Sequence, residues 1–186
     1  MSDKPKIARS IAIPVAEEII TLLSPCCERI AIAGSLRRGN AEVGDIEILY
    51  VPRMSERPDG LFDKKIVSVA EEVINLHLDN GYFSKRQNKA GSFTWGESNK
   101  LAIHTRSGIP VDLFSTTQPR WWVSLVIRTG SKDMNLALTM GAIAKNAHLN
   151  AYGVGVTWSD GSVTEATSEE HVFELCGVKY REPKDR

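Results

Sequence analysis

Residues 34–49 read GSLRRGNAEVGDIEIL, and this stretch decides how the rest of the chain is interpreted. A short apolar segment, residues 29–33, precedes it, and its second half alternates polar and apolar residues with the period of a β-strand. On such a strand Asp45 and Glu47 point to the same face, about 7 Å apart along the backbone, while the isoleucines that alternate with them point into a core. The stretch therefore predicts a strand, a glycine-bearing turn and a second strand that carries two neighbouring carboxylates.

Paired carboxylates on one strand face suit a hard cation such as Mg²⁺, which prefers oxygen ligands and usually shares its site with phosphates. The alternative is that Asp45 and Glu47 are only the solvated face of an edge strand. Two features favour the first interpretation: the backbone N–H groups of the Gly34-Ser35 turn suit phosphate oxygens, and the adjacent Arg37 and Arg38 can bind phosphate in a fork. A third acid, Asp112, lies within another apolar run, where a carboxylate is costly unless it is paired or metal-bound.

The remaining sequence alternates helical and strand patterns. Apolar residues recur at helical spacing in 14–24, with Pro14 at the first helical position, and again in 63–79. Residues 100–104 and 109–114 flank a turn and predict a hairpin. Four further segments are expected after residue 116: a helix over 119–128, a helix over 132–147 that Ser131 caps, a turn within 152–164, and a short helix that Ser168 caps and Gly177 ends. This order predicts an α+β fold with a mixed sheet backed by helices, and a domain boundary near residue 116.

Composition excludes several classes of protein. The chain has 186 residues with 23 basic and 23 acidic side chains, and 42% of its residues are hydrophobic, which argues against disorder and against a polybasic tail. The longest uncharged apolar stretches fall well short of the ~20 residues that cross a bilayer, so we expect no membrane association. Three cysteines, of which Cys26 and Cys27 are adjacent, predict free thiols and not a disulfide framework. We therefore expect an intracellular protein that is cytoplasmic, nuclear or virus-associated, and not a secreted one.

The neutral total conceals an uneven distribution of charge. Residues 84–106 carry five basic residues against Glu97 alone, a net charge of +4, whereas residues 158–177 carry five acids and no base. A basic stretch is usually a solvated face, yet it can also contact phosphates. We therefore regard Lys85, Arg86 and Lys89 as candidate DNA contacts.

Taken together, the motifs resemble the nucleotidyltransferase superfamily and, within it, the family X DNA polymerases. The resemblance runs from about residue 10 to the end of the chain. It rests on five ordered motifs, which are residues 33–39, residues 43–46, Thr129-Gly130-Ser131 with Asn135, residues 149–152 and residues 179–186. It implies a catalytic palm domain over residues 1–115 and a small α/β thumb domain over residues 116–186.

The resemblance also implies roles for individual residues. Asp45, Glu47 and Asp112 would be the ligands of two divalent ions, Mg²⁺ with Mn²⁺ as a substitute, in an in-line attack of a primer 3′-hydroxyl on a nucleotide α-phosphate. The nucleotide would be held by Gly34, Ser35, Arg38, Gly44, Ile127, Arg128, Gly130 and Asn135. Lys132 joins the three cations named above as a candidate DNA contact.

The chain departs from the family pattern at several positions. Glu47 replaces an aspartate, Ile127 and Arg128 replace an aromatic pair beside the sugar, and Thr139 replaces an arginine that contacts the template strand. These changes predict a weakened preference for deoxyribonucleotides and a weaker grip on the template. The chain would also begin at the palm, which leaves the family's lyase domain before residue 1.

The sequence thus predicts a monomeric, DNA-directed DNA polymerase that uses dNTP, and NTP to some extent, to extend primers in short gaps. A template-independent terminal nucleotidyltransferase is the first alternative. The second is a catalytically silent module that binds DNA or a nucleotide.

Overall fold

The computed structural model describes residues 6–60 and 63–186, which form two compact units. The first unit contains the residues through Ile32 and the segment Glu42–Ser115, and the second contains Ala33–Ala41 and Thr116–Arg186. The change of unit after Ser115 coincides with the change of sequence pattern near residue 116. The segment Ala33–Ala41, which the sequence analysis assigned to the first domain, belongs to the second unit.

A five-stranded mixed sheet forms the centre of the first unit. Its strands run in the order β2-β4-β9-β8-β7, with β4 and β9 parallel and the other neighbours antiparallel. They are β2 (Cys27–Ile32), β4 (Ile46–Pro52), β9 (Ile109–Ser115), β8 (Asn99–His104) and β7 (Phe83–Lys85). The prediction of an α+β fold with a mixed sheet is confirmed. Because β4 has a partner on both sides, Glu47 does not lie on an edge strand, and the edge-strand alternative is wrong for this residue.

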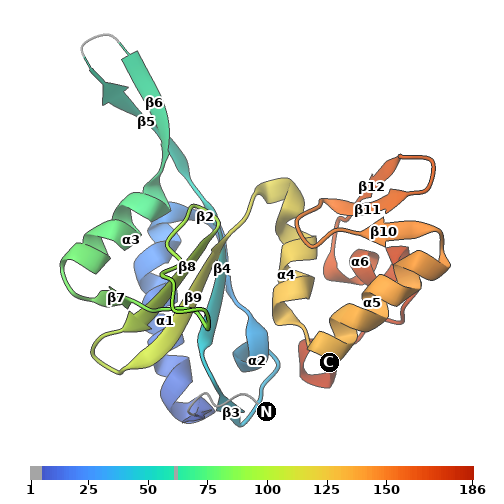
Figure 1. Cartoon of the computed structure of the whole chain (residues 1–186), viewed down its shortest axis with the longest axis horizontal. Helices are drawn as coiled ribbons and strands as arrows, with labels where there is room; N and C mark the ends of the chain where they lie inside the picture. The colour runs from blue at the N-terminus through green and yellow to red at the C-terminus, as the bar shows by residue number, and fades with distance from the viewer. Residues whose placement is uncertain (1–5, 61–62) are drawn as a thin grey trace. The chain divides into compact units, whose positions relative to one another are not determined.

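Helices α1 (Arg9–Leu23) and α3 (Val69–Asp79) pack against β4 and against each other (Figure 1). The strand side chains Ile46, Ile48 and Tyr50 share one face and are at most 1% exposed, so this face is fully buried. Helix α1 begins five residues before the predicted start and contains Pro14 in its interior. A 3-10 turn, Ser24–Cys26, and a two-stranded pairing of β1 (Ile7–Ala8) with β3 (Glu42–Val43) complete this region.

A β-hairpin, which the sequence analysis missed, extends away from the sheet of the first unit (Figure 1). It pairs β5 (Met54–Asp59) with β6 (Asp63–Ser68). The predicted helix over 63–79 is therefore wrong in its first six residues, and Ile66 is 70% exposed on a strand. The helix begins only after Ser68, whose hydroxyl accepts a hydrogen bond from the Glu71 amide at 3.1 Å and caps α3.

The second unit packs helices against a small antiparallel sheet of order β10-β11-β12. Its elements are α2 (Gly34–Arg37), a 3-10 turn (Gln118–Arg120), α4 (Trp121–Thr129), α5 (Lys132–Ala144), β10 (Ala147–Leu149), β11 (Gly155–Trp158), β12 (Val163–Glu165), α6 (Glu169–Leu175) and a last 3-10 turn (Pro183–Asp185). Ser131 and Ser168 cap α5 and α6 as expected, since each hydroxyl accepts an amide hydrogen bond three residues on. Helix α5 ends before the predicted residue 147, because the chain turns at Asn146, with φ of 56°, into β10.

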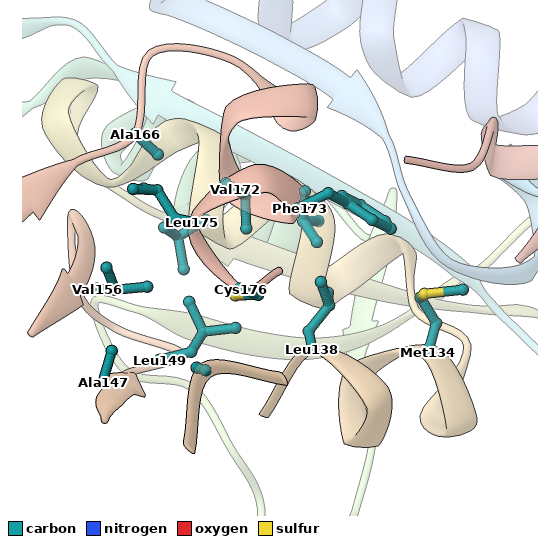
Figure 2. Close-up of a cluster of buried hydrophobic side chains, with 13 residues drawn as sticks. Met134, Leu138, Ala147, Leu149, Val156, Ala166, Val172, Phe173, Leu175 and Cys176 are labelled. Atoms are coloured by element: carbon teal, nitrogen blue, oxygen red, sulfur yellow. The ribbon is translucent and has the colours of Figure 1, made fainter. Parts of the chain in front are cut away.

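The core of the second unit lies between these helices and the sheet (Figure 2). Leu138, Val156 and Phe173 are completely buried in it. Gly141 permits the close approach of α5 to the end of α6, since a Cβ there would lie 2.2 Å from the carbonyl oxygen of Cys176. Any side chain at position 141 would force the two helices apart.

The three cysteines are free, as the sequence predicts, and all three are buried. Burial raises the pKa of Cys27 to about 12 and that of Cys176 to about 11, so both side chains are neutral thiols at pH 7. Within the part of the chain that the structure describes, no helix is both long and apolar enough to cross a membrane.

Candidate active site

Two of the three predicted metal ligands lie side by side on the two central parallel strands of the first unit. Glu47 on β4 and Asp112 on β9 are direct register partners, so their side chains leave the same face of the sheet. Asp45 immediately precedes β4 instead of lying on it. Asp112 is 9% exposed, whereas Asp45 and Glu47 are half-buried. The structure thus brings Glu47 and Asp112 side by side, with Asp45 at the start of the same strand.

Arg86, which follows β7, forms an ion pair with Asp112 through its Nη2 atom. Two like charges on register partners repel each other, and a guanidinium beside one of them offsets that repulsion. The Arg86 side chain is 20% exposed, so this pair is largely shielded from water. Its basic character made Arg86 a candidate DNA contact, but the structure directs it to a carboxylate of its own unit.

The donor chemistry of this face suits a hard divalent cation. Carboxylate oxygens are the ligands that Mg²⁺ and Mn²⁺ prefer, and Glu47 and Asp112 provide them on adjacent strands. Across residues 6–60 and 63–186, however, no three or more His, Cys, Asp or Glu side chains gather closely enough to hold a metal ion. The acids are therefore neighbours along two strands, and one of them is engaged by Arg86.

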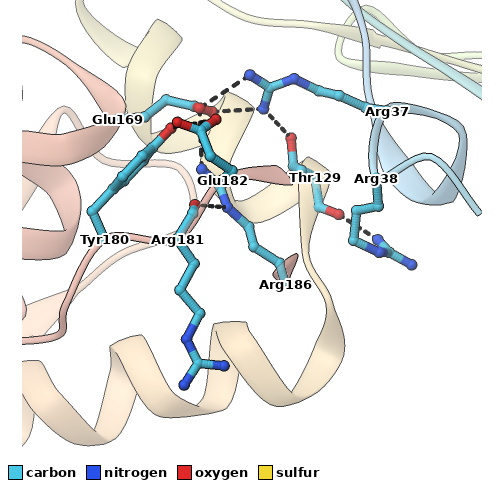
Figure 3. A network of polar contacts seen from close by, with 8 residues as sticks. All are labelled: Arg37, Arg38, Thr129, Glu169, Tyr180, Arg181, Glu182 and Arg186. Carbon is cyan, nitrogen blue, oxygen red and sulfur yellow. Dashed lines mark hydrogen bonds and ion pairs between the residues drawn. The ribbon is translucent and has the colours of Figure 1, made fainter. Parts of the chain in front are cut away.

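In the second unit, Arg38 is fixed against the end of α4. Its Nη1 atom donates a hydrogen bond to the carbonyl oxygen of Thr129 (Figure 3). The next residue, Gly130, ends α4 with φ of 67°, which L side chains rarely adopt. A Cβ at Gly130 would lie 3.3 Å from Arg38 Nη1. Glycine at position 130 therefore permits the positive φ of the turn and leaves room for the Arg38 guanidinium.

Asn135 lies on the first turn of α5 and ties that helix to α4. Its Nδ2 atom donates to the carbonyl oxygen of Ile127 at 2.8 Å. Its Oδ1 atom is buried and has no hydrogen-bond partner among the described residues. The Ile127 side chain packs partly buried against the core of the second unit. The predicted nucleotide-binding residues Arg38, Ile127, Gly130 and Asn135 thus lie together in one unit.

A polar network that the sequence analysis did not predict holds the same unit together (Figure 3). Arg37 donates to both carboxylate oxygens of Glu169, at 2.7 and 3.0 Å, and to the Thr129 hydroxyl at 2.6 Å. Arg186 donates to Glu169 Oε2 at 3.1 Å and to the Arg181 carbonyl oxygen at 2.8 Å. Arg37 is therefore a structural partner of Glu169 and not a free phosphate ligand.

The other predicted site residues are distributed over both units. Gly34 and Ser35 begin α2 in the second unit, whereas Gly44 precedes Asp45 in the first. Lys85 and Lys89 are exposed in the first unit and Lys132 is exposed in the second. Arg128, in the last turn of α4, is half-buried. No local signal in the sequence pointed to Glu169 or Arg186, because their partners lie more than a hundred residues away or near the end of the chain.

Comparison with known proteins agrees with this arrangement. The family model described as DNA polymerase beta thumb matches residues 124–186, which lie within the second unit. DNA polymerase lambda of Rattus norvegicus is 24% identical to the chain over 168 residues, which cover 82% of this chain and 28% of that polymerase. The chain thus spans little more than a quarter of the length of this relative. Both findings identify it as similar to the family X DNA polymerases, with a thumb-type second unit.

Proposed function

We propose, from the similarity of this chain to the family X DNA polymerases, that it adds nucleotides to a primer 3′-hydroxyl in short gaps of DNA, directed by the template strand. The observation that carries the proposal is the register pairing of Glu47 with Asp112 on two central parallel strands, preceded by Asp45. Two carboxylates are rarely placed side by side in a largely buried position unless a cation compensates them.

In this proposal Asp45, Glu47 and Asp112 would hold two Mg²⁺ ions, which Mn²⁺ would replace. Bound there, the ions would lower the pKa of the attacking hydroxyl and stabilise charge on the leaving oxygen. Arg86 would act as a counterion to Asp112, because its guanidinium compensates the same carboxylate that the metal needs.

Most of the proposed nucleotide contacts belong to the second unit. Arg38, fixed at the end of α4, offers further N–H donors for a phosphate oxygen. Gly130 keeps the turn beside it free of a side chain, and the buried Asn135 Oδ1 is an acceptor that a donor on the nucleotide would satisfy. Gly34, Ser35 and Gly44 would contribute backbone N–H groups or a hydroxyl to the triphosphate. Exposed Lys85, Lys89 and Lys132 would contact DNA phosphates.

Primer extension on a gapped duplex tests the proposal, with each nucleotide supplied in turn under Mg²⁺ and under Mn²⁺. Asp45→Ala and Asp112→Ala should each abolish transfer while the protein stays folded, and Glu47→Asp should retain it. Asp59→Ala is the matched control, because Asp59 is an acid of the same unit whose side chain is 59% exposed and forms a surface ion pair with Lys65. Near-native turnover in Asp112→Ala, with unaltered metal dependence, would contradict the assignment.

Two alternatives predict different outcomes in primer extension and in calorimetry. Transfer without template would identify a terminal nucleotidyltransferase, which is consistent with Thr139, whose hydroxyl donates to the Asn135 carbonyl oxygen at 2.9 Å instead of reaching outward. The pairing of Arg86 with Asp112 favours a silent binding module. That alternative predicts metal-dependent heat on titration of a nucleotide, with no product under any condition.

A further inference from the structure

The loop after β7 places aromatic rings and positive charges together on the surface of the first unit. Lys85 and Lys89 are exposed, Phe93 is 60% exposed, and Trp95 is half-buried. We call these four residues the aromatic-basic loop. A single exposed apolar side chain is ordinary on a protein surface, and what distinguishes Phe93 is that it shares one loop with Trp95 and two exposed lysines.

Hydrogen bonds hold the loop in one conformation. The Asn88 side-chain oxygen accepts from the amides of Ala90 and Ser92, at 2.9 and 3.1 Å. The backbone N–H of Asn88 donates to the Ser92 carbonyl oxygen at 2.8 Å, and Gln87 forms an antiparallel β-bridge with Phe93. Because the backbone is already ordered, a ligand that stacks on Phe93 would not have to order it.

The two rings share one side of the loop. Phe93 and Trp95 are two residues apart in an extended segment, so their side chains leave the same side of the chain. Thr94 between them faces the other way, where its hydroxyl accepts a hydrogen bond from the Asn88 side-chain Nδ2 atom at 3.4 Å. Trp95 donates its indole N–H to Asn75 Oδ1 at 2.9 Å, and the Lys85 Nζ atom lies 5.4 Å from the Trp95 ring centroid. Trp95 is thus fixed and covered by a cation, whereas Phe93 presents its ring to solvent.

The charges of this region are divided in the same way. Three of the five cations in residues 84–106 are held by carboxylates: Arg86 by Asp112, Lys100 by Glu71 and Arg106 by Glu18. The other two cations, Lys85 and Lys89, are exposed and therefore give the surface of this loop its positive character.

We propose that the aromatic-basic loop binds single-stranded nucleic acid, with an unpaired base stacked on Phe93 and neighbouring phosphates at Lys85 and Lys89. Exposed aromatic rings beside cations are the combination that binds single strands without sequence readout. An apolar protein partner fits less well, because the same loop carries the exposed cations Lys85 and Lys89. The inference rests on the proposed function in one respect: the single strand is the unpaired template. Binding itself requires no nucleotide transfer.

Fluorescence anisotropy of labelled oligonucleotides tests the proposal. The probes are a short oligothymidylate, a chain of the same length that carries abasic sugars, and a duplex. Phe93→Ala should weaken oligothymidylate binding about fivefold or more, which is the loss of one stacked base. It should leave binding of the abasic chain unchanged, whereas Lys89→Gln should weaken both chains. Phe93→Tyr should bind as wild type does.

Ile66→Ala is the matched control, because Ile66 is 70% exposed on β6 of the same unit and lies outside the loop. It should bind every probe as wild type does. The proposal is overturned if Phe93→Ala retains full oligothymidylate affinity, or if it weakens the abasic chain or the duplex equally. A protein that binds in this manner yet transfers no nucleotide would contradict the proposed function alone. A protein that transfers nucleotides with Phe93 irrelevant would contradict only the inference.

Discussion

Glu169→Ala is expected to destabilise the second unit strongly, because Glu169 compensates two arginines. Its side chain is 7% exposed and accepts hydrogen bonds from Arg37 and from Arg186 (Figure 3). The Arg186 side chain is completely buried, with its guanidinium carbon 4.9 Å from the Phe173 ring centroid and 5.5 Å from that of Tyr180. Removal of the carboxylate would leave this guanidinium buried against two rings without its anion.

Breaking one side of a buried ion pair costs about 3–5 kcal/mol, because the remaining charge stays desolvated. Glu170 provides the matched control, since it is the next residue of α6 and is exposed. Its removal should cost at most about 1 kcal/mol, the contribution of an acid in the first turn of a helix. The two neighbouring substitutions therefore separate compensation of the buried charge from a general effect on the helix.

Urea unfolding followed by tryptophan fluorescence measures the difference, because Trp121, Trp122 and Trp158 all lie in the second unit. With a urea m-value of about 1–3 kcal/mol/M, the midpoint of Glu169→Ala should fall by roughly 1 M or more. The Glu170→Ala midpoint should stay close to that of wild type. If the two variants unfold within about 1 kcal/mol of each other at equal m-value, the reasoning about the buried network is refuted.

Three further outcomes are expected. Burial lowers the pKa of His104, against a smaller opposing effect of Glu18. The contribution of neutral His104 to the free energy of unfolding should therefore be fully present above pH 6.5, the ordinary histidine pKa, and should be lost as the pH falls. His104→Leu should flatten this pH profile in denaturant titrations from pH 7 to 5. Gly130→Ala should cost about 1–2 kcal/mol in urea unfolding and weaken nucleotide binding in calorimetry, since its φ is 67° and the new Cβ would meet Arg38. In single-nucleotide insertion assays, the ratio of the specificity constants for dNTP and NTP should be about tenfold smaller for wild type than for the Ile127→Tyr/Arg128→Phe double variant. Equal ratios would show that these two residues have only a structural role.

Much of the fold follows from local patterns in the sequence. The alternation after Asp45 predicts a strand that the structure places at Ile46–Pro52, and Ser131 and Ser168 cap helices where expected. The β5–β6 hairpin was missed because Ile66 continues the apolar spacing of helix α3 across the cap at Ser68. The predicted helix was therefore too long at its start, where the residues pair with another strand. The sequence pattern of a single segment does not reveal its hydrogen bonds to another strand.

For the candidate site too, the sequence predicts what depends on local spacing and not what depends on contacts between distant residues. The carboxylates could be found from spacing, because Asp45 and Glu47 are two residues apart and Asp112 lies within an apolar run. Their cation could not, since Arg86 reaches Asp112 only through the order of the strands β9, β8 and β7. The register that brings Glu47 beside Asp112 creates a repulsion that some cation must offset, and in this structure Arg86 contributes to that role. Any divalent ion that binds Asp112 must therefore compete with a guanidinium, and removal of that guanidinium should strengthen metal binding even where it weakens the fold.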